Sequence, residues 1–163
     1  TVDDIDELAE LMNMLKKENK SFKLTLSVSS FVPKAHTPFQ WTKRENNTII
    51  QEKMDYLRKK LLKSKVLFKP TSIKWDYIQA VLSRGDRRLA PLLEKVYRYN
   101  GSWGSWGRSV KELKQENIII PDLDWYALRE RSFDEILPWD FIDCGVNKTV
   151  LRQEYEYSCK NWA

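Results

Sequence analysis

Residues 22–41, FKLTLSVSSFVPKAHTPFQW, decide the fold that this sequence predicts. Every second residue from Phe22 to Val28 is apolar, and this two-residue period is typical of a β-strand with one buried face. The alternate positions are polar. After Lys23 they carry small hydroxyl groups on one face of the strand: Thr25, Ser27 and Ser29. That face either meets solvent, as in many half-exposed strands, or lines a polar cavity.

The strand is followed by a loop with an unusual content of bulky and polar side chains. Pro33 and Pro38 stiffen its backbone and lower the entropy lost on ordering. Hydrogen-bonding groups and aromatic rings lie between and around the prolines: Phe31, His36, Thr37, Phe39, Gln40 and Trp41. In a βα barrel, the residues after a strand lie over the active face. The loop therefore either forms the rim of a binding pocket or closes the end of a barrel without touching ligand.

The remaining periodicity is mostly helical. Apolar stripes predict helices over residues 2–18 and 45–63, a short strand over 65–68, and then a series of helices. Within that series the expected stripes lie over 75–82 and 89–97, a Gly-rich link covers 101–107, and further helices cover 110–117 and 148–159. One or two strands do not make a stable sheet by themselves. The sequence thus predicts an α/β fragment, predominantly helical, whose front part belongs to a larger βα array.

Composition narrows the class of protein. The chain has 163 residues, a net charge of +5 and 31% charged residues, as expected for a folded globular protein. The first residues are acidic and no long apolar run follows, so we expect no signal peptide and no membrane span. The two cysteines, Cys144 and Cys159, favour a reduced, cytoplasmic protein. No metal-ligand constellation surrounds the lone His36, and we expect no metal site.

Three motifs have both a structural and a functional interpretation. In RGDRR (84–88), Asp86 is expected to cap a helix rather than to complete an adhesion motif. The tryptophans of GSWGSWG (101–107) either stack on a base or fix the loop to the core. Three acidic residues near the C-terminus are expected to cap helices rather than to act as paired catalytic carboxylates: Glu135, Asp140 and Asp143.

Four stretches also resemble a known family. SVSSFVPKAHTPFQW (27–41) is similar to the last barrel strand and following loop of radical S-adenosylmethionine (SAM) enzymes, especially the group with an N-terminal cobalamin-binding domain. LSRGDRRL (82–89) and LPWDFIDCGVNKTVLRQEY (137–155) resemble the C-terminal extension of one such bacterial group. TVDDIDELAELM (1–12) resembles the helix that follows a Gly-Leu-Pro-Thr-Glu-Thr stretch in the family.

The resemblance implies a C-terminal fragment of a radical SAM protein. Residues 1–70 would be the end of a partial TIM-like barrel, and 71–163 a helical extension. The parent would bind a [4Fe-4S] cluster, SAM and cobalamin, and would form a 5′-deoxyadenosyl radical. The three-cysteine cluster motif is absent here, so the fragment should be inactive and bind no cofactor alone. Its contribution to the barrel lumen and rim would be Thr25, Ser27, Ser29, Pro33, His36, Thr37 and Phe39.

Two other functions stay open. Ten basic residues against three acidic ones in 43–74 form a block that either contacts nucleic acid or is a solvated helix face. A nucleic-acid-binding module would use Lys59, Lys60, Lys63 and Lys65 together with Trp103 and Trp106. Alternatively, the helical extension is a protein-interaction surface. The expected partners are the missing N-terminal part of the parent and, through exposed strand edges, a second copy of the chain.

Overall fold

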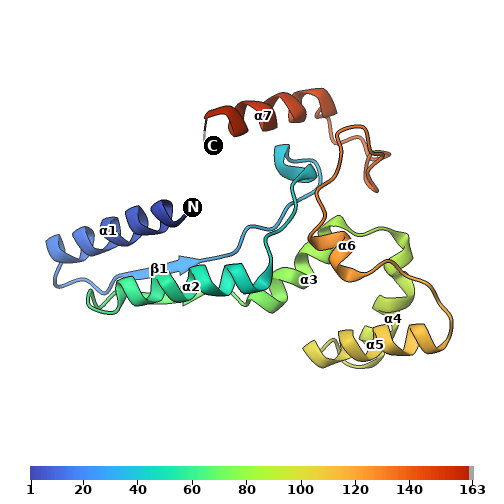
Figure 1. The fold of residues 1–163 in the computed structure, drawn as a ribbon, viewed down its shortest axis with the longest axis horizontal. Helices are drawn as coiled ribbons and strands as arrows, with labels where there is room; N and C mark the ends of the chain where they lie inside the picture. The colour runs from blue at the N-terminus through green and yellow to red at the C-terminus, as the bar shows by residue number, and fades with distance from the viewer. Residues whose placement is uncertain (162–163) are drawn as a thin grey trace. The chain divides into compact units, whose positions relative to one another are not determined.

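The computed structural model describes residues 1–161, which form two units (Figure 1). Unit 1 consists of residues 1–31 and 45–76, and unit 2 of residues 32–44 and 77–161 among those described. The loop after the first strand therefore belongs to unit 2, although the predicted domains divided the chain once, near residue 70. The α/β and predominantly helical character is confirmed, whereas a barrel stays a proposal because the described residues contain only two strands.

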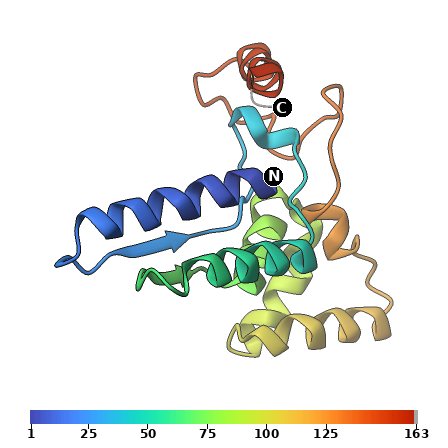
Figure 2. The same cartoon turned by 60° about the vertical axis from the view of Figure 1, so that its left-hand side comes forward.

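Unit 1 is a β-α-β unit with an additional helix in front. Its elements are α1 (Val2–Glu18), β1 (Thr25–Val28), α2 (Asn47–Leu61) and β2 (Leu67–Pro70). The two strands are parallel, with Thr25 opposite Leu67 and Val28 opposite Pro70. Helices α1 and α2 run alongside β1 in both views (Figures 1 and 2). A parallel pair requires a long crossover, and α2 provides it.

The two helices bury their apolar stripes against one face of the strands. Ala9, Met12, Leu57 and Leu61 are buried together, and the apolar residues of β1 pack against this cluster. The sequence predicted both stripes, because they recur at helical spacing. Local caps fix where the helices begin: the Thr1 side chain accepts a hydrogen bond from the Asp4 amide. The predicted strand over 22–29 is shorter in the structure, and the one expected over 65–68 begins two residues later.

Unit 2 is helical. Helix α3 (Ile73–Arg84) begins in unit 1 and ends in unit 2. The other elements in chain order are the 3-10 turn η1 (Pro38–Trp41), the 3-10 turn η2 (Arg87–Leu89), α4 (Ala90–Arg98), α5 (Trp103–Gln115), α6 (Leu123–Ala127) and α7 (Lys148–Asn161). A first core lies among α3, α4, α5 and α6 around Val81, Leu92 and Tyr126. A second joins η1 to the C-terminal segment around Trp41 and Trp139.

The structure corrects two expectations about these helices. The Gly-rich segment 101–107 is not a link, because α5 begins at Trp103 and runs through Gly104 and Gly107. Burial of Trp106 and Leu113 on one helical face outweighs the low helix propensity of glycine there. In the stripe over 75–82, Trp75 and Leu82 are 45% and 46% exposed, so the buried face of α3 is narrower than predicted. The short helix α6 was not expected.

No helix within residues 1–161 combines the length and the apolar character that crossing a bilayer requires.

Gly85, between α3 and η2, lies where a side chain cannot fit. A Cβ at this position would be 2.4 Å from Leu89 Cδ1 and 2.8 Å from the Val81 carbonyl oxygen. We expect Gly85→Ala to lower the free energy of unfolding by about 1–3 kcal/mol, because the backbone must shift to relieve the contact. Urea denaturation followed by circular dichroism measures it.

The matched control is Gly104→Ala in α5, where a Cβ would meet nothing within 4 Å. Alanine is the better helix former, so this variant should gain about 0.5–1 kcal/mol. Equal effects of the two substitutions would contradict the close approach at Gly85.

Candidate functional site

The hydroxyl residues of β1, together with Ser29 directly after it, form an open face. Thr25, Ser27 and Ser29 are exposed, whereas Leu26 and Val28 between them are partly buried against the helices. The alternation predicted from the sequence is therefore present. Within unit 1 all three of these hydroxyl residues are exposed on this face.

The loop that follows is fixed at several points within unit 2. The Pro33 carbonyl accepts a hydrogen bond from the Ser83 hydroxyl at 2.9 Å. The Thr37 hydroxyl donates to the Lys34 carbonyl at 2.8 Å. Phe39 is 38% exposed and makes an edge-to-face contact with Tyr155, with the ring centroids 5.9 Å apart. Pro33, Thr37 and Phe39 thus stabilise the loop through contacts inside the chain.

Gln40 is the central residue of this loop. It is 2% exposed, and its Oε1 atom accepts hydrogen bonds from the Trp139 indole N–H at 2.7 Å and from the His36 amide at 3.2 Å. Trp41, also 2% exposed, packs edge-to-face on Phe133. The PFQW motif therefore connects the loop to the segment around residue 139. Sequence reasoning identified Gln40 as a hydrogen-bonding residue and Trp41 as an aromatic residue of the loop. It missed this connection, because the partner of Gln40 is 99 residues away.

His36 lines a pocket beside this connection. Its backbone φ is 55°, a conformation uncommon for residues other than glycine and associated with functional or strained sites. Its Nε2 atom is buried and has no hydrogen-bond partner among residues 1–161. The pocket has a volume of about 380 Å³, and its other polar lining residues are Gln40, Asp140, Asp143 and Lys148. Of the predicted rim residues, His36 alone is among the residues that line it.

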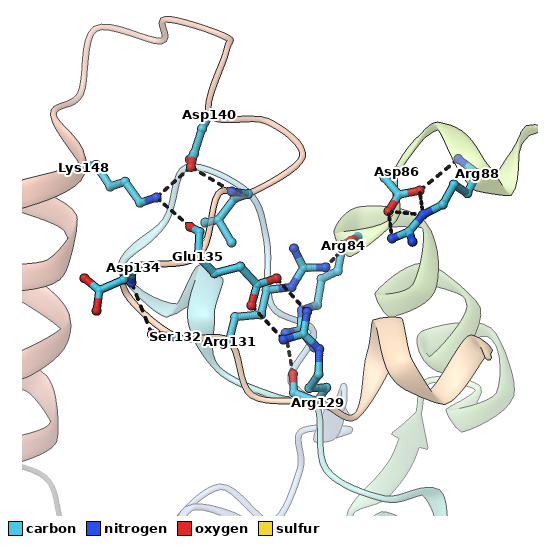
Figure 3. Close-up of polar contacts among 11 residues, drawn as sticks. Arg84, Asp86, Arg88, Arg129, Arg131, Ser132, Asp134, Glu135, Asp140 and Lys148 are labelled. Carbon is cyan, nitrogen blue, oxygen red and sulfur yellow. Dashed lines mark hydrogen bonds and ion pairs between the residues drawn. The ribbon is translucent and has the colours of Figure 1, made fainter. Parts of the chain in front are cut away.

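The acidic residues of this region are held by cations rather than paired with each other. Asp140 accepts hydrogen bonds from Lys148 Nζ at 2.7 Å and from the Leu137 amide at 2.8 Å (Figure 3). Glu135 forms a two-pronged ion pair with Arg129, both N–O distances being 2.7 Å. The hydrogen bonds from Arg129 hold the pKa of the Glu135 carboxyl below its usual value. The expected helix caps are therefore wrong for all three acids, since Glu135 and Asp140 pair with cations and Asp143 accepts a hydrogen bond from the Gly145 amide at 2.8 Å in the segment between α6 and α7.

The sequence did not predict that arginines lie in the interior of unit 2, where Arg44 is 1% exposed and two more are buried near the end of α3. Arg84 and Arg131 are 0% and 4% exposed. Arg84 donates to the Ala127 carbonyl at 2.9 Å. It also donates to the Arg129 carbonyl at 2.6 Å, and Arg131 donates to the Arg84 carbonyl at 2.5 Å (Figure 3). Burial and the neighbouring guanidinium groups lower the pKa of Arg84 to about 10, which leaves it charged at neutral pH.

The RGDRR motif is therefore structural. Arg84 is interior, and the Asp86 side chain accepts a hydrogen bond from the Arg88 amide at 2.9 Å, which confirms the predicted cap at the start of η2. Asp86 also pairs with the Arg88 guanidinium, whose hydrogen bonds lower the pKa of the carboxyl (Figure 3). An adhesion motif needs its arginine in solvent, and this one is enclosed.

Of the two tryptophans proposed to stack on bases, only one is accessible. Trp106 is 6% exposed in the core of unit 2, so its ring is not available to stack on a base, and only Trp103, at 40%, stays accessible. This corrects the aromatic part of the nucleic-acid hypothesis. The basic part is unaffected, since Lys59, Lys60, Lys63 and Lys65 are all exposed in unit 1.

The thiols do not form a cluster site. Cys144 and Cys159 are free and exposed, and residues 1–161 contain no group of three or more histidine, cysteine or acidic side chains that could hold a metal ion. A [4Fe-4S] cluster normally takes three or four thiolates. The side chains of this chain therefore do not fit the cluster that the resemblance implies.

Comparisons of the chain with protein-family models, with curated proteins and with solved structures gave no match.

Replacing Arg84 tests the interior hydrogen bonds. Arg84→Met keeps much of the side-chain volume but removes both bonds to the carbonyls, so we expect the free energy of unfolding to fall by about 3 kcal/mol. Arg98→Met is the control, because Arg98 is 67% exposed and pairs only with Glu94 one turn away. It should change stability by no more than about 0.5 kcal/mol. Similar losses in both variants would refute the structural role of Arg84.

The Glu135–Arg129 pair predicts a pH dependence. Because the folded protein lowers the pKa of Glu135, the carboxylate stabilises the fold above its unfolded pKa of 4.5, and this contribution is lost as pH falls through the lower folded value. Glu135→Gln should therefore be less stable than wild type by about 1 kcal/mol at pH 7, with the difference shrinking below about pH 4. Urea midpoints at pH 7 and pH 3 measure it. A difference that stays constant with pH would contradict the ion pair.

Proposed function

We propose that this chain is the C-terminal part of a radical SAM enzyme, of the group with an N-terminal cobalamin-binding domain. The observation that carries the proposal is the one-sided parallel pair in unit 1. Parallel sheets are normally covered on both faces. Here α1 and α2 cover one face, and the other presents Thr25, Ser27 and Ser29, which are exposed within unit 1. On β2 the same face carries Leu67 and Lys69, opposite Thr25 and Ser27. A wall with helices on its outer side and a largely polar inner side would suit a barrel around a cofactor.

This chain would contribute side chains that bind SAM and help to enclose it. The hydroxyl groups of β1 can donate and accept hydrogen bonds, as the sugar and amino-acid moieties of SAM require. His36, whose buried Nε2 has no hydrogen-bond partner in the described part of the chain, lies on the loop that leaves this strand. The cluster, which supplies the electron for cleavage of SAM, would have to be ligated by cysteines elsewhere in the parent. We assign no catalytic residue to this chain, which alone should be inactive.

The outer edges of β1 and β2 support the same proposal. Within residues 1–161 each strand pairs only with the other, so each has one row of backbone groups without a strand neighbour. Such edges are templates for further pairing. The preceding strands of a parent barrel would occupy an edge, and without them a second copy of this chain would be the alternative partner.

The test uses the complete reading frame that encodes this chain. We expect it to contain Cys-x3-Cys-x2-Cys upstream of Thr1. The anaerobically purified, iron- and sulfide-reconstituted product should then release 5′-deoxyadenosine from SAM under reducing conditions, measured by chromatography. A frame without the three-cysteine motif, or a product that forms no 5′-deoxyadenosine, would refute the proposal.

Substitutions on β1 test the assignment of the lumen. The combined change Thr25→Val, Ser27→Ala and Ser29→Ala removes the three hydroxyls and should weaken SAM binding by at least about tenfold, at roughly 0.5–1.5 kcal/mol for each hydrogen bond removed. Thr48→Val, at an exposed position of α2, is the control and should bind normally. Unchanged binding by the triple variant would overturn the lumen assignment while leaving the family proposal in place.

A further inference from the structure

Six lysines surround one hollow on the surface of unit 1, at the C-terminal ends of α1 and α2 and in the turns that follow them. We call it the lysine hollow. It has a volume of about 610 Å³ and is lined by Lys16, Lys17, Lys20, Lys60, Lys63 and Lys65. Three of these lysines come from the acidic first fifth of the sequence, so the charge pattern of the chain alone did not indicate the cluster.

Few negative charges balance these lysines. Lys60 pairs with Asp6 at 3.1 Å, and the Lys16 ammonium group donates to the carbonyls of Lys20 and Phe22. Among residues 1–161, the other four have no ion-pair partner. Each helix C-terminus adds about half a negative charge, so two ends and one carboxylate account for about two of the six positive charges. A surplus of about four charges converges on the hollow.

The turn after α2 adds a second observation. Lys65 has a backbone φ of 57°, in the left-handed region, where glycine or asparagine would be less strained. A lysine there places one more ammonium group on the lining instead of relieving the backbone. Lys65 is not needed to balance the helix dipoles, because Lys16 and Lys17 already lie in the last turn of α1 and Lys60 in the last turn of α2.

The lining selects the chemical class of the ligand. Its two other residues, Asn13 and Ser64, are polar and uncharged, and the lining contains neither an arginine nor an aromatic side chain. Ammonium groups bind phosphates as point charges, without the planar fork that recognises a base edge or a carboxylate. Without a ring in the hollow, bases have nothing on which to stack. The contacts would therefore be with phosphates and would be independent of base identity.

We propose that the lysine hollow binds the sugar–phosphate backbone of a nucleic acid strand. Anionic membrane is the competing surface, because Phe22 and Leu62 are exposed beside these lysines in the sequence, at 64% and 71%. Membrane docking combines lysines with apolar side chains inserted into the lipid. Neither apolar residue lines the hollow, which favours a strand lying in it. This inference does not depend on the radical SAM proposal, and either can fail without the other.

Fluorescence anisotropy with labelled 20-nucleotide oligouridylate and oligoadenylate tests the proposal. The wild-type chain should bind both with similar affinity, and the affinity should fall steeply as salt is raised. The variant Lys17→Gln, Lys20→Gln, Lys63→Gln and Lys65→Gln should bind at least tenfold more weakly. The slope of log affinity against log salt should drop by up to about 3, at roughly 0.7 for each phosphate of a single strand that the variant no longer neutralises.

The control removes the same charge from other exposed positions: Lys69→Gln, Lys111→Gln, Lys114→Gln and Lys160→Gln. Both variants change the net charge from +5 to +1, since each loses four lysines. The control should bind within about twofold of wild type, and both variants should keep the wild-type circular dichroism spectrum.

Four outcomes would overturn the proposal. Equal losses in the two variants would assign binding to net charge, and a strong preference for one oligonucleotide would require base contacts that the hollow lacks. No binding to either oligonucleotide at 50 mM salt would exclude the ligand. Binding to phosphatidylserine vesicles with none to the oligonucleotides would assign the lysines to a membrane surface.

Discussion

Unit 2 depends on two arginines that would be costly to bury in most proteins. A guanidinium group taken from water must recover its lost hydration from hydrogen bonds inside the protein. Arg84 recovers it from the carbonyls of Ala127 and Arg129, and Arg131 from the carbonyl of Arg84. These bonds connect the end of α3 to the chain after α6. The partners are backbone atoms, so the connection depends on where the chain runs more than on which side chains it carries there.

This arrangement explains why part of the fold could be predicted and part could not. The stripes of α1 and α2, the caps at Thr1 and Asp86 and the alternation of β1 are local patterns, and each is present as expected. Arg84 is different, because a charged residue in a charged motif is expected in solvent. Only carbonyls more than forty residues away make its burial possible. The helix through Gly104 and Gly107 was missed for a similar reason, since burial of Trp106 outweighs local propensity.

The candidate site also has a part that could be predicted from the sequence and a part that could not. The hydroxyl face of β1 could be predicted, because alternation needs only neighbours in sequence. The pocket beside His36 could not, because Asp140 and Lys148 approach it from about a hundred residues further on. The lysine hollow is a third case, in which lysines from α1 join those from α2 only after the β-α-β unit has folded.

The packing also changes what the family resemblance can mean. Two of its stretches contact each other through Gln40 and Trp139, and a third places Arg84 in the interior. Residues with such roles are constrained by the fold, whatever reaction the protein performs. Their presence is therefore explained by the packing of this chain, and it does not by itself argue for a particular chemistry. The exposed Thr25, Ser27 and Ser29 have no such role among the described residues, so evidence for a cofactor must be sought at this face of β1.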